Sequence, residues 1–410
     1  MKRLTPVRRR LVATGLGGAL ALGLGAATPA LAGLAESPVK ASNTHTVTAW
    51  GTSNDKAGGS LTDITVRNIV NLTVGGTDVR VRLSNFSGTA PLALSSVWVG
   101  SPTSSSSADL VPGSNRQATF AGKTTVTIPA GGSVLTDVLP GTVEPQQNLA
   151  ISVAISGTSA VITAHNRSMQ YSFKSSTGDH AAEDSGASFG TQSAIWYYLD
   201  AVTVSAPRTV STVAALGDSI TDGVGSGINE NHRWTDYLAD RIAQLPDPRR
   251  FGVTNEGISG NRLLTGGGST GPAGLTRLVH DVLTKPGITT LVLFEGINDI
   301  GGGASATSLI AGYQQAVAQA HSAGVCVVGA TVTPAGSAVG STSEETRLAV
   351  NEFIRTSGIY DHVVDFDAVT KDAAAPNQLR AEFDSGDHIH PNDAAYEAMA
   401  NAIDLDALRC

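Results

Sequence analysis

The residues of this chain that could perform covalent chemistry stand in two short blocks, one near the middle and one near the end. Ser219 follows the apolar run 213–216 and the dipeptide Gly217-Asp218. A hydroxyl is a weak nucleophile unless a base removes its proton and a third group orients that base. Asp387 and His390 can supply both, because a spacing of three residues lets one tight turn place the carboxylate beside the imidazole. These residues predict acyl transfer with Ser219 as nucleophile, His390 as base and Asp387 as the orienting acid.

Two further blocks lie between them and offer groups that could stabilise a developing negative charge. Gly260, in the block 257–261, has no side chain and therefore permits a close approach of substrate to the backbone. Asn298 carries a neutral amide that can point at the oxyanion of a tetrahedral intermediate. We expect the oxyanion hole to consist of the backbone N–H groups of Ser219 and Gly260 and the side-chain amide of Asn298. Gly257 is the alternative to Gly260.

In this order and spacing, the four blocks resemble the SGNH, or GDSL, hydrolase family, which is named for its Ser, Gly, Asn and His. The resemblance covers about residues 210–405, and it is to secreted actinobacterial members of the arylesterase or acylhydrolase type. It implies a carboxylic ester hydrolase that works through an acyl-enzyme on Ser219, without a cofactor or a metal.

Several neighbouring residues invite other interpretations. His388 is the alternative base, but no acid precedes it by three residues. Asp218 and Asp299 are expected to hold loops through backbone hydrogen bonds. Cys326 lies in an apolar run and is expected to be a small buried hydrophobe. A disulfide between Cys326 and Cys410 remains an alternative.

Two segments, 186–190 and 267–271, also match the pattern G-x-S-x-G. A nucleophile elbow needs a strand before it and a helix after it, whereas both segments lie in polar, turn-rich stretches. We therefore expect loops at both places. Asn261, Arg262 and the glycines that follow either shape the substrate pocket or form a surface loop.

From residue 206 to 410 the pattern predicts strands that alternate with amphipathic helices, as in a parallel sheet covered by helices on both faces. The resemblance implies a flavodoxin-like, three-layer α/β/α SGNH hydrolase domain here. The predicted strands are 212–216, 253–255, 290–294, 325–330 and 363–366. The predicted helices are 234–245, 272–284, 306–322, 343–356 and 392–404.

Residues 45–205 carry short runs that alternate apolar and polar side chains, separated by turns rich in Gly, Ser and Pro. This pattern predicts an all-β accessory domain that resembles a sandwich or a jelly roll. Three of the four tryptophans fall here, Trp50, Trp98 and Trp196, and aromatic faces serve both as sugar platforms and as core residues. We expect this domain either to dock on a polymeric substrate or to wall one side of the catalytic cleft.

The first 32 residues combine an arginine run, an apolar stretch and the sequence Ala30-Leu31-Ala32, which is typical of a signal peptide cleaved near Ala32. Residues 33–44 then read as a linker. A membrane anchor is the alternative, although about 17 apolar residues are marginal for a span. We therefore expect a secreted protein without a membrane span after cleavage.

Composition limits the function further. The net charge of the 410-residue chain is −8, and the predicted signal peptide contains basic residues but no acidic ones. A mature chain this acidic is unsuited to binding nucleic acid. We expect a monomer that acts on a small ester, an acylated polysaccharide or a lipid. The first choice is a carboxylesterase or acetylesterase, and a lipase or lysophospholipase is second. A carbohydrate-binding protein with a vestigial hydrolase domain is third.

Overall fold

The computed structural model of this chain describes residues 43–57, 59–247, 249–336 and 341–409. The predicted signal peptide, nearly all of the predicted linker and Cys410 lie outside the described residues. From Asn43 onward the chain forms one compact unit. None of the helices in the described ranges combines the length and the hydropathy that a membrane span requires.

The described residues from 43 to 207 form strands and turns but no helix, as the alternating sequence pattern predicts. The strands of this β region are β1 (Thr44–Gly51), β2 (Asp55–Ala57), β3 (Leu61–Thr62), β4 (Ile64–Asn71), β5 (Gly76–Ser84), β6 (Leu92–Gly100), β7 (Arg116–Gln117), β8 (Val126–Ile128), β9 (Ser133–Leu135), β10 (Leu139–Val143), β11 (Asn148–Ile155), β12 (Thr158–Ser159), β13 (Ile162–Asn166), β14 (Ser172–Thr177), β15 (Thr191–Ser193), β16 (Ile195–Tyr197) and β17 (Leu199–Pro207).

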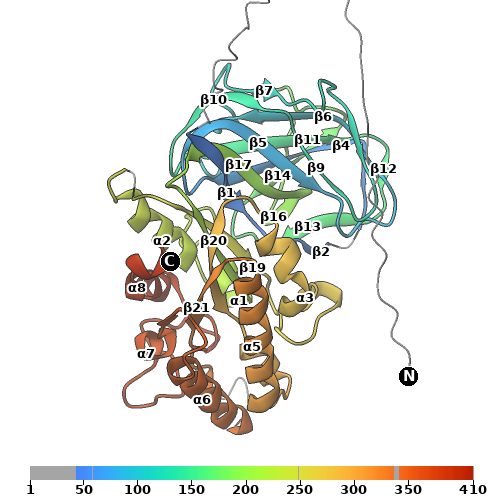
Figure 1. The fold of residues 1–410 in the computed structure, drawn as a ribbon. Coiled ribbons are helices and arrows are strands. Elements are labelled where there is room, and N and C mark those ends of the chain that lie inside the picture. The colour runs from blue at the N-terminus through green and yellow to red at the C-terminus, as the bar shows by residue number, and fades with distance from the viewer. Residues whose placement is uncertain (1–42, 58, 248, 337–340, 410) are drawn as a thin grey trace, which may run out of the picture. The chain divides into compact units, whose positions relative to one another are not determined.

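Two antiparallel sheets make up most of the β region, which is coloured blue to green in Figure 1. One has the order β1-β17-β5-β10 with β9 also paired to β5, and the other has the order β15-β14-β4-β11-β6-β7 with β8 paired to β6. Val47 and Val81 from the first sheet and Val66 and Ile151 from the second are fully buried in one hydrophobic cluster. The two sheets therefore share a core.

The remainder of the chain forms an α/β region around a parallel sheet. Its strands are β18 (Thr212–Gly217), β19 (Gly252–Gly257), β20 (Ile288–Phe294), β21 (Cys326–Ala330) and β22 (His362–Val364). They are ordered β19-β18-β20-β21-β22, and every neighbouring pair is parallel. This is the strand order of flavodoxin-like sheets, in which the ligand site lies at the carboxyl ends of the strands where the order reverses. Here the reversal lies at β18.

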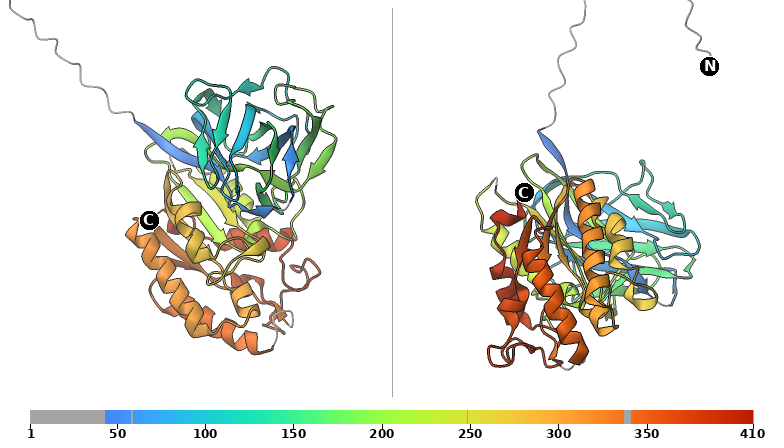
Figure 2. Two further views of the ribbon diagram at one scale, coloured as in Figure 1. Left: turned by 90° about the vertical axis from the view of Figure 1, so that its right-hand side faces the viewer. Right: turned by 60° about the horizontal axis from the view of Figure 1, so that its bottom comes forward.

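Helices cover both faces of this sheet. They are α1 (Ser219–Asp222), α2 (Trp234–Ala243), α3 (Gly274–Leu278), α4 (Ile297–Gly301), α5 (Ala306–Ser322), α6 (Ser341–Thr356), α7 (Phe366–Thr370) and α8 (Asp393–Ala402), with a π-helical turn at Val279–Leu283 and 3-10 turns at Gly268–Thr270 and Asp406–Leu408. Helix α8 packs against α2 and α7, whereas α5 packs against α3 and α6 on the opposite face (Figures 1 and 2).

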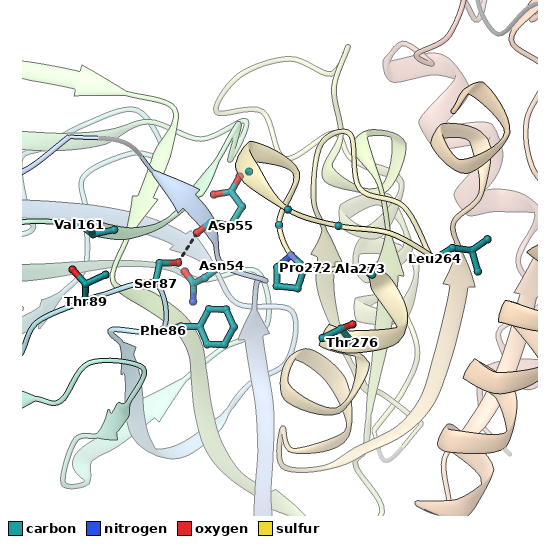
Figure 3. Close-up of a pocket in the computed structure, with 14 residues that line it drawn as sticks. Asn54, Asp55, Phe86, Ser87, Thr89, Val161, Leu264, Pro272, Ala273 and Thr276 are labelled. Atoms are coloured by element: carbon teal, nitrogen blue, oxygen red, sulfur yellow. Dashed lines mark hydrogen bonds between the residues drawn. The ribbon is translucent and has the colours of Figure 1, made fainter. Parts of the chain in front are cut away.

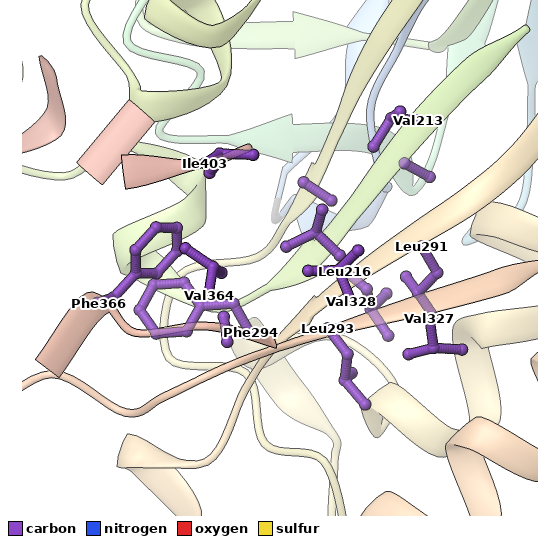
Figure 4. Close-up of a cluster of buried hydrophobic side chains, with 14 of the residues drawn as sticks. Val213, Leu216, Leu291, Leu293, Phe294, Val327, Val328, Val364, Phe366 and Ile403 are labelled. Atoms are coloured by element: carbon purple, nitrogen blue, oxygen red, sulfur yellow. The ribbon is translucent and has the colours of Figure 1, made fainter. Parts of the chain in front are cut away.

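The core of the α/β region is built from the continuous apolar strands that a sheet buried on both faces requires. Figure 4 shows Val213 and Leu216 from β18 beside Leu291 and Leu293 from β20. The predicted strand 363–366 is wrong at its end. The Asp365 side chain accepts a hydrogen bond from the Ala368 N–H, so it caps a helix that begins at Phe366.

The β region and the α/β region meet along β1. The Thr48 N–H donates to the carbonyl oxygen of Pro286 at 2.9 Å, and the Thr212 hydroxyl donates to the carbonyl oxygen of Thr48 at 2.9 Å. Beside them, Lys285 Nζ lies 2.6 Å from Glu256 Oε1 and also donates to the carbonyl oxygen of Thr52. The Lys285 and Glu256 side chains are 1% and 0% exposed, so this contact places an ion pair in the interior.

We predict that Lys285→Met will lower the free energy of unfolding by about 3–5 kcal/mol, because it leaves the Glu256 carboxylate buried without its cation. Thermal and urea unfolding would measure the change. Lys371→Met is the matched control: the Lys371 side chain is 39% exposed and lies 3.6 Å from Asp367, so it should cost only ~0–1 kcal/mol. If both variants lost the same free energy of unfolding, the buried ion pair would not be more important for stability than the exposed one.

Candidate functional site

Ser219 lies at the carboxyl end of β18, where the strand passes into the short helix α1. The Asp218 carboxylate accepts a hydrogen bond from the Ile220 N–H at 2.9 Å and so caps this helix. Ser219 is buried but lines a cavity of about 560 Å³. Its hydroxyl therefore reaches the ligand-binding edge of the sheet from a fixed turn.

The structure brings Ser219, His390 and Asp387 together. His390 Nε2 lies 2.8 Å from Ser219 Oγ, and His390 Nδ1 lies 2.6 Å from Asp387 Oδ2. An ionised carboxylate only accepts hydrogen bonds, so Nδ1 carries the proton toward Asp387. Nε2 is then left as an acceptor for the Ser219 hydroxyl, which is the geometry that a general base requires.

A tight turn holds the Asp387 carboxylate in this position. Its Oδ1 accepts hydrogen bonds from the N–H groups of Ile389 and His390 at 3.0 and 2.8 Å. Partial burial alone would raise the pKa of Asp387, but the hydrogen bonds from the His390 side chain and from these N–H groups lower it to about 2. Asp387 is therefore ionised throughout the neutral range.

His388, the alternative base, points away from the nucleophile. Its Nδ1 lies 2.5 Å from Asp384 Oδ2, and its side chain is largely exposed to solvent. A spacing of three residues, as between Asp387 and His390, gives His388 no acid. Asp384 precedes His388 by four residues and also accepts its backbone N–H.

Gly260 and Asn298 line the same cavity as Ser219. Asn298 Nδ2 donates to the carbonyl oxygen of Asn261 at 3.0 Å, which fixes the plane of its amide. Gly260 has a φ of +77°, a conformation that favours glycine. Among the described residues, no acceptor bonds the N–H of Ser219 or Gly260. The alternative, Gly257, does not line the cavity.

Three residues of the β region that sequence reasoning missed line this cavity as well. They are Asp55, the first residue of β2, Asn166, the last residue of β13, and Arg167 directly after it. Asn166 donates through its N–H and its Nδ2 to Asp55 Oδ1, at 3.1 and 2.7 Å, which ties the two segments together. The β region thus walls one side of the cleft, one of the two roles considered from the sequence.

Two of the three tryptophans of the β region form no exposed platform, whereas Trp98 is partly exposed. Trp50 and Trp196 are buried and meet edge to face, with ring centroids 4.8 Å apart. The indole N–H of Trp196 donates to the carbonyl oxygen of Ile69 at 2.8 Å. These two residues belong to the core of the β region, so neither offers a surface to a polymer.

A buried chain of hydrogen bonds connects the β region to the loop of Gly260. His165 Nδ1 lies 2.8 Å from the carbonyl oxygen of Ser53, and its Nε2 lies 2.9 Å from Asp222 Oδ1. The other oxygen of Asp222 accepts the N–H and the hydroxyl of Ser259 at 3.0 and 2.5 Å. Ser259 immediately precedes Gly260.

His165 carries a positive charge in this arrangement. Both of its ring nitrogens face acceptors, a carbonyl oxygen and a carboxylate, so both must donate. Burial alone would lower the pKa of His165, but the charge of Asp222 and the hydrogen bond to it raise the pKa above the ordinary histidine value. The ion pair thereby satisfies Asp222, which in turn holds Ser259.

Beneath the cavity, the guanidinium of Arg277 joins several loops. It donates to the carbonyl oxygens of Gly217 and Glu256 at 2.8 and 2.6 Å, and to the Asn261 side chain at 2.9 Å. Its remaining partners are the Ser53 hydroxyl at 2.9 Å and the carboxylates of Asp281 and Glu295 at 3.2 Å.

The motifs that the sequence interpretation assigned to loops do lie in loops. Residues 186–190 contain turns only, and 267–271 contain the 3-10 turn Gly268–Thr270. Asp299 accepts hydrogen bonds from the N–H groups of Leu263 and Leu264, which is the structural role expected of it. The described part of the chain holds no group of three or more His, Cys, Asp or Glu side chains that could bind a metal ion.

Comparison with known proteins adds the following. No curated protein matches the chain. A protein from Desulfitobacterium hafniense DCB-2, assigned to the lipolytic G-D-S-L family, is 23% identical, with a TM-score of 0.38; the match covers 47% of this chain and 97% of that one. The aryl esterase of M. smegmatis is 17% identical, with a TM-score of 0.37, over 47% of this chain and 96% of that one. Sequence identities and TM-scores this low do not identify a substrate.

Residues 215–398 match the family model described as the GDSL-like lipase/acylhydrolase family. The matched range holds the residues that line the cavity in the α/β region and the acid beside His390, namely Ser219, Gly260, Asn298, Asp387 and His390. This part of the chain is therefore similar to the GDSL-like lipase/acylhydrolase family.

Proposed function

We propose that the protein is a serine ester hydrolase in which Ser219, His390 and Asp387 form the catalytic triad. One observation carries this proposal: His390 bridges Ser219 Oγ and Asp387 Oδ2 at 2.8 and 2.6 Å, in a cavity that also presents Gly260 and Asn298. The expected carboxylic ester hydrolase class agrees with this set of groups.

The reaction begins when Ser219 Oγ attacks the ester carbonyl carbon and His390 Nε2 takes the hydroxyl proton. The carbonyl oxygen becomes an oxyanion, which accepts hydrogen bonds from the N–H groups of Ser219 and Gly260 and from the Asn298 amide. The carbon–oxygen bond to the alcohol then breaks, and His390 returns its proton to the leaving alkoxide. Water, deprotonated by His390, releases the acid and restores Ser219.

The lining of the cavity favours a small acyl group on a polar alcohol over a long-chain lipid. Asp55, Asn166 and Arg167 all line it, and an alkyl chain placed against them would displace water from charged and polar side chains, which costs free energy. This supports an acetylesterase-like activity on an acylated saccharide. The basic and apolar residues at 1–32 support export, and the two sheets with a common core support a β-sandwich as the accessory domain.

We expect Ser219→Ala and His390→Asn each to reduce kcat on p-nitrophenyl acetate by at least ~1,000-fold, because either change disables proton transfer from the nucleophile. The matched control is His388→Asn, since asparagine tolerates the positive φ of 66° at this position. It should retain most of the activity. A His388→Asn variant as inactive as His390→Asn would show that the base has been assigned wrongly.

The rate should also fall as the pH is lowered, because a protonated His390 cannot accept the proton of Ser219. The pKa of Asp387 is lowered to about 2, so this carboxylate stays ionised far below the range in which imidazoles titrate. A plot of log kcat/KM against pH should therefore have a single acid limb of slope one above pH ~4. A limb of slope two there would mean that a second group loses its required charge.

The hydrogen bonds that run from His165 through Asp222 to Ser259 should affect kcat more than KM, because they position the Gly260 N–H, which donates to the transition state. We predict that His165→Asn will lower kcat about 10-fold or more, as a loosened Gly260 no longer meets the oxyanion. Ser259→Ala removes one hydrogen bond to Asp222 and should cause a smaller loss.

A double-mutant cycle separates this positioning role from general destabilisation. If His165 acts through Asp222 and Ser259, the losses in kcat of the two variants will not add in the double variant. The measurement is made well below the melting temperature of each variant. Additive losses in kcat, or a change in KM alone, would refute the positioning role.

A further inference from the structure

A second cavity, of about 580 Å³, lies where the β region meets the glycine-rich loop before α3 (Figure 3). Its volume falls within the ~300–1,000 Å³ of ordinary small-molecule sites. Phe86 and Val161 line it from the β region, and Leu264, Pro272 and Ala273 line it from the other side. Its walls are therefore largely apolar.

One polar side chain in this cavity has no partner. Asn54 is only 3% exposed, yet among the described residues neither its Nδ2 nor its Oδ1 has a hydrogen-bond partner. A buried amide left without partners costs free energy, so native proteins almost always satisfy it with a protein group, water or a ligand. In Figure 3 Asn54 lies between Ser87 and Phe86, on the cavity wall.

The groups around Asn54 define the chemistry of a fitting ligand. Its amide offers both a donor and an acceptor, and the hydroxyls of Ser87, Thr89 and Thr276 line the same space. The ring of Phe86 is 36% exposed and is braced by His280, with centroids 4.8 Å apart. A neutral ring with hydroxyls on its edge and C–H groups on its face satisfies all of these groups, and a sugar unit is such a ring.

Other ligand classes fit less well. An alkyl chain would suit the apolar walls but would leave the Asn54 amide unsatisfied. An anionic ligand would meet no cation, because the only ionisable side chain among the lining residues of the described chain is Asp55. The lining thus selects a neutral hydroxylated molecule.

This cavity adjoins the catalytic one. Asp55 lines both, and the loop 266–271 separates them: its glycines Gly266, Gly267, Gly268 and Gly271 line the second cavity, whereas Ser269 lines the catalytic cavity. A molecule that spans this wall can occupy both cavities at once.

We propose that this second cavity, which we call the Asn54 subsite, binds a neutral sugar unit of an acylated saccharide whose ester lies at Ser219. This inference rests on the proposed ester hydrolase function for its catalytic consequence, but the binding of a saccharide can be tested without turnover.

The binding experiment uses the full chain with Ser219→Ala, titrated with unacylated xylotriose by calorimetry. We expect measurable binding that Asn54→Leu and Phe86→Ala each weaken at least 10-fold. Asn54→Leu should not lower the melting temperature, because it removes an unsatisfied amide. If the Asn54→Leu variant fails to fold, Phe86→Ala provides the test of binding instead. Val111→Ala, which trims an exposed side chain outside both cavities, is the control and should bind as the parent does.

The kinetic experiment compares acetylated xylotriose with p-nitrophenyl acetate in the Ser219 background. Asn54→Leu should reduce kcat/KM on the acetylated saccharide at least 10-fold more than on the small ester, chiefly through KM. Saccharide binding that survives both substitutions would overturn the proposal. So would a rate that rises with acyl chain length and depends on Phe86, since the cavity would then hold an alkyl chain. If saccharide binds at Asn54 but no ester is cleaved, the proposed function fails and the subsite stands.

Discussion

The guanidinium of Arg277 is the contact on which the geometry of the site depends. It bonds the carbonyl oxygens at the ends of β18 and β19 and the Glu295 carboxylate directly after β20. Because a guanidinium is planar and its N–H groups have fixed directions, these three strand ends cannot shift independently. The same side chain reaches Ser53, so the β region is fastened to the same point. The loops that follow the three strand ends carry, in order, Ser219, Gly260 and Asn298.

Around the buried Arg277 cation, beneath the nucleophile, acidic side chains outnumber basic ones. Burial raises the pKa of Asp218 to about 7 and, with the nearby charge of Asp218, raises that of Glu295 well above its ordinary value. Burial would also raise the pKa of Asp281, but the hydrogen bond from His280 and the charge of Arg277 lower it to about 2. Asp218 and Glu295 therefore keep their protons to higher pH than exposed carboxyls do. A neutral acid in this place avoids repelling the oxyanion that forms above it, whereas an ionised one would oppose it.

Much of the α/β region could be predicted because its signals are local. Apolar runs mark the strands, and the spacing of Asp387 and His390 fits one turn, so the pair is visible without the fold. The contributions of the β region carry no such signal. His165 is a single histidine in the short strand β13, and Arg167 lies in the turn that follows it; only tertiary packing brings His165 against Asp222. The tryptophans were ambiguous for the same reason, since composition cannot tell a core ring from an exposed one.

The glycine-rich segment 266–271 resembles motifs whose functions it does not have, yet it lies between the two cavities. Its spacing imitates a nucleotide-binding fingerprint and a nucleophile elbow, but it has neither a preceding strand nor a βαβ unit. The glycines serve packing: a Cβ at Gly266 would collide with the backbone of Pro272 and Ala273, and Gly271, at a φ of +67°, would press a Cβ against Ile258. The loop lines both cavities, because its glycines line the second cavity and Ser269 lines the catalytic one. This loop is therefore the wall between the ester site and the Asn54 subsite, and a side chain at Gly266 or Gly271 would have to displace its neighbours.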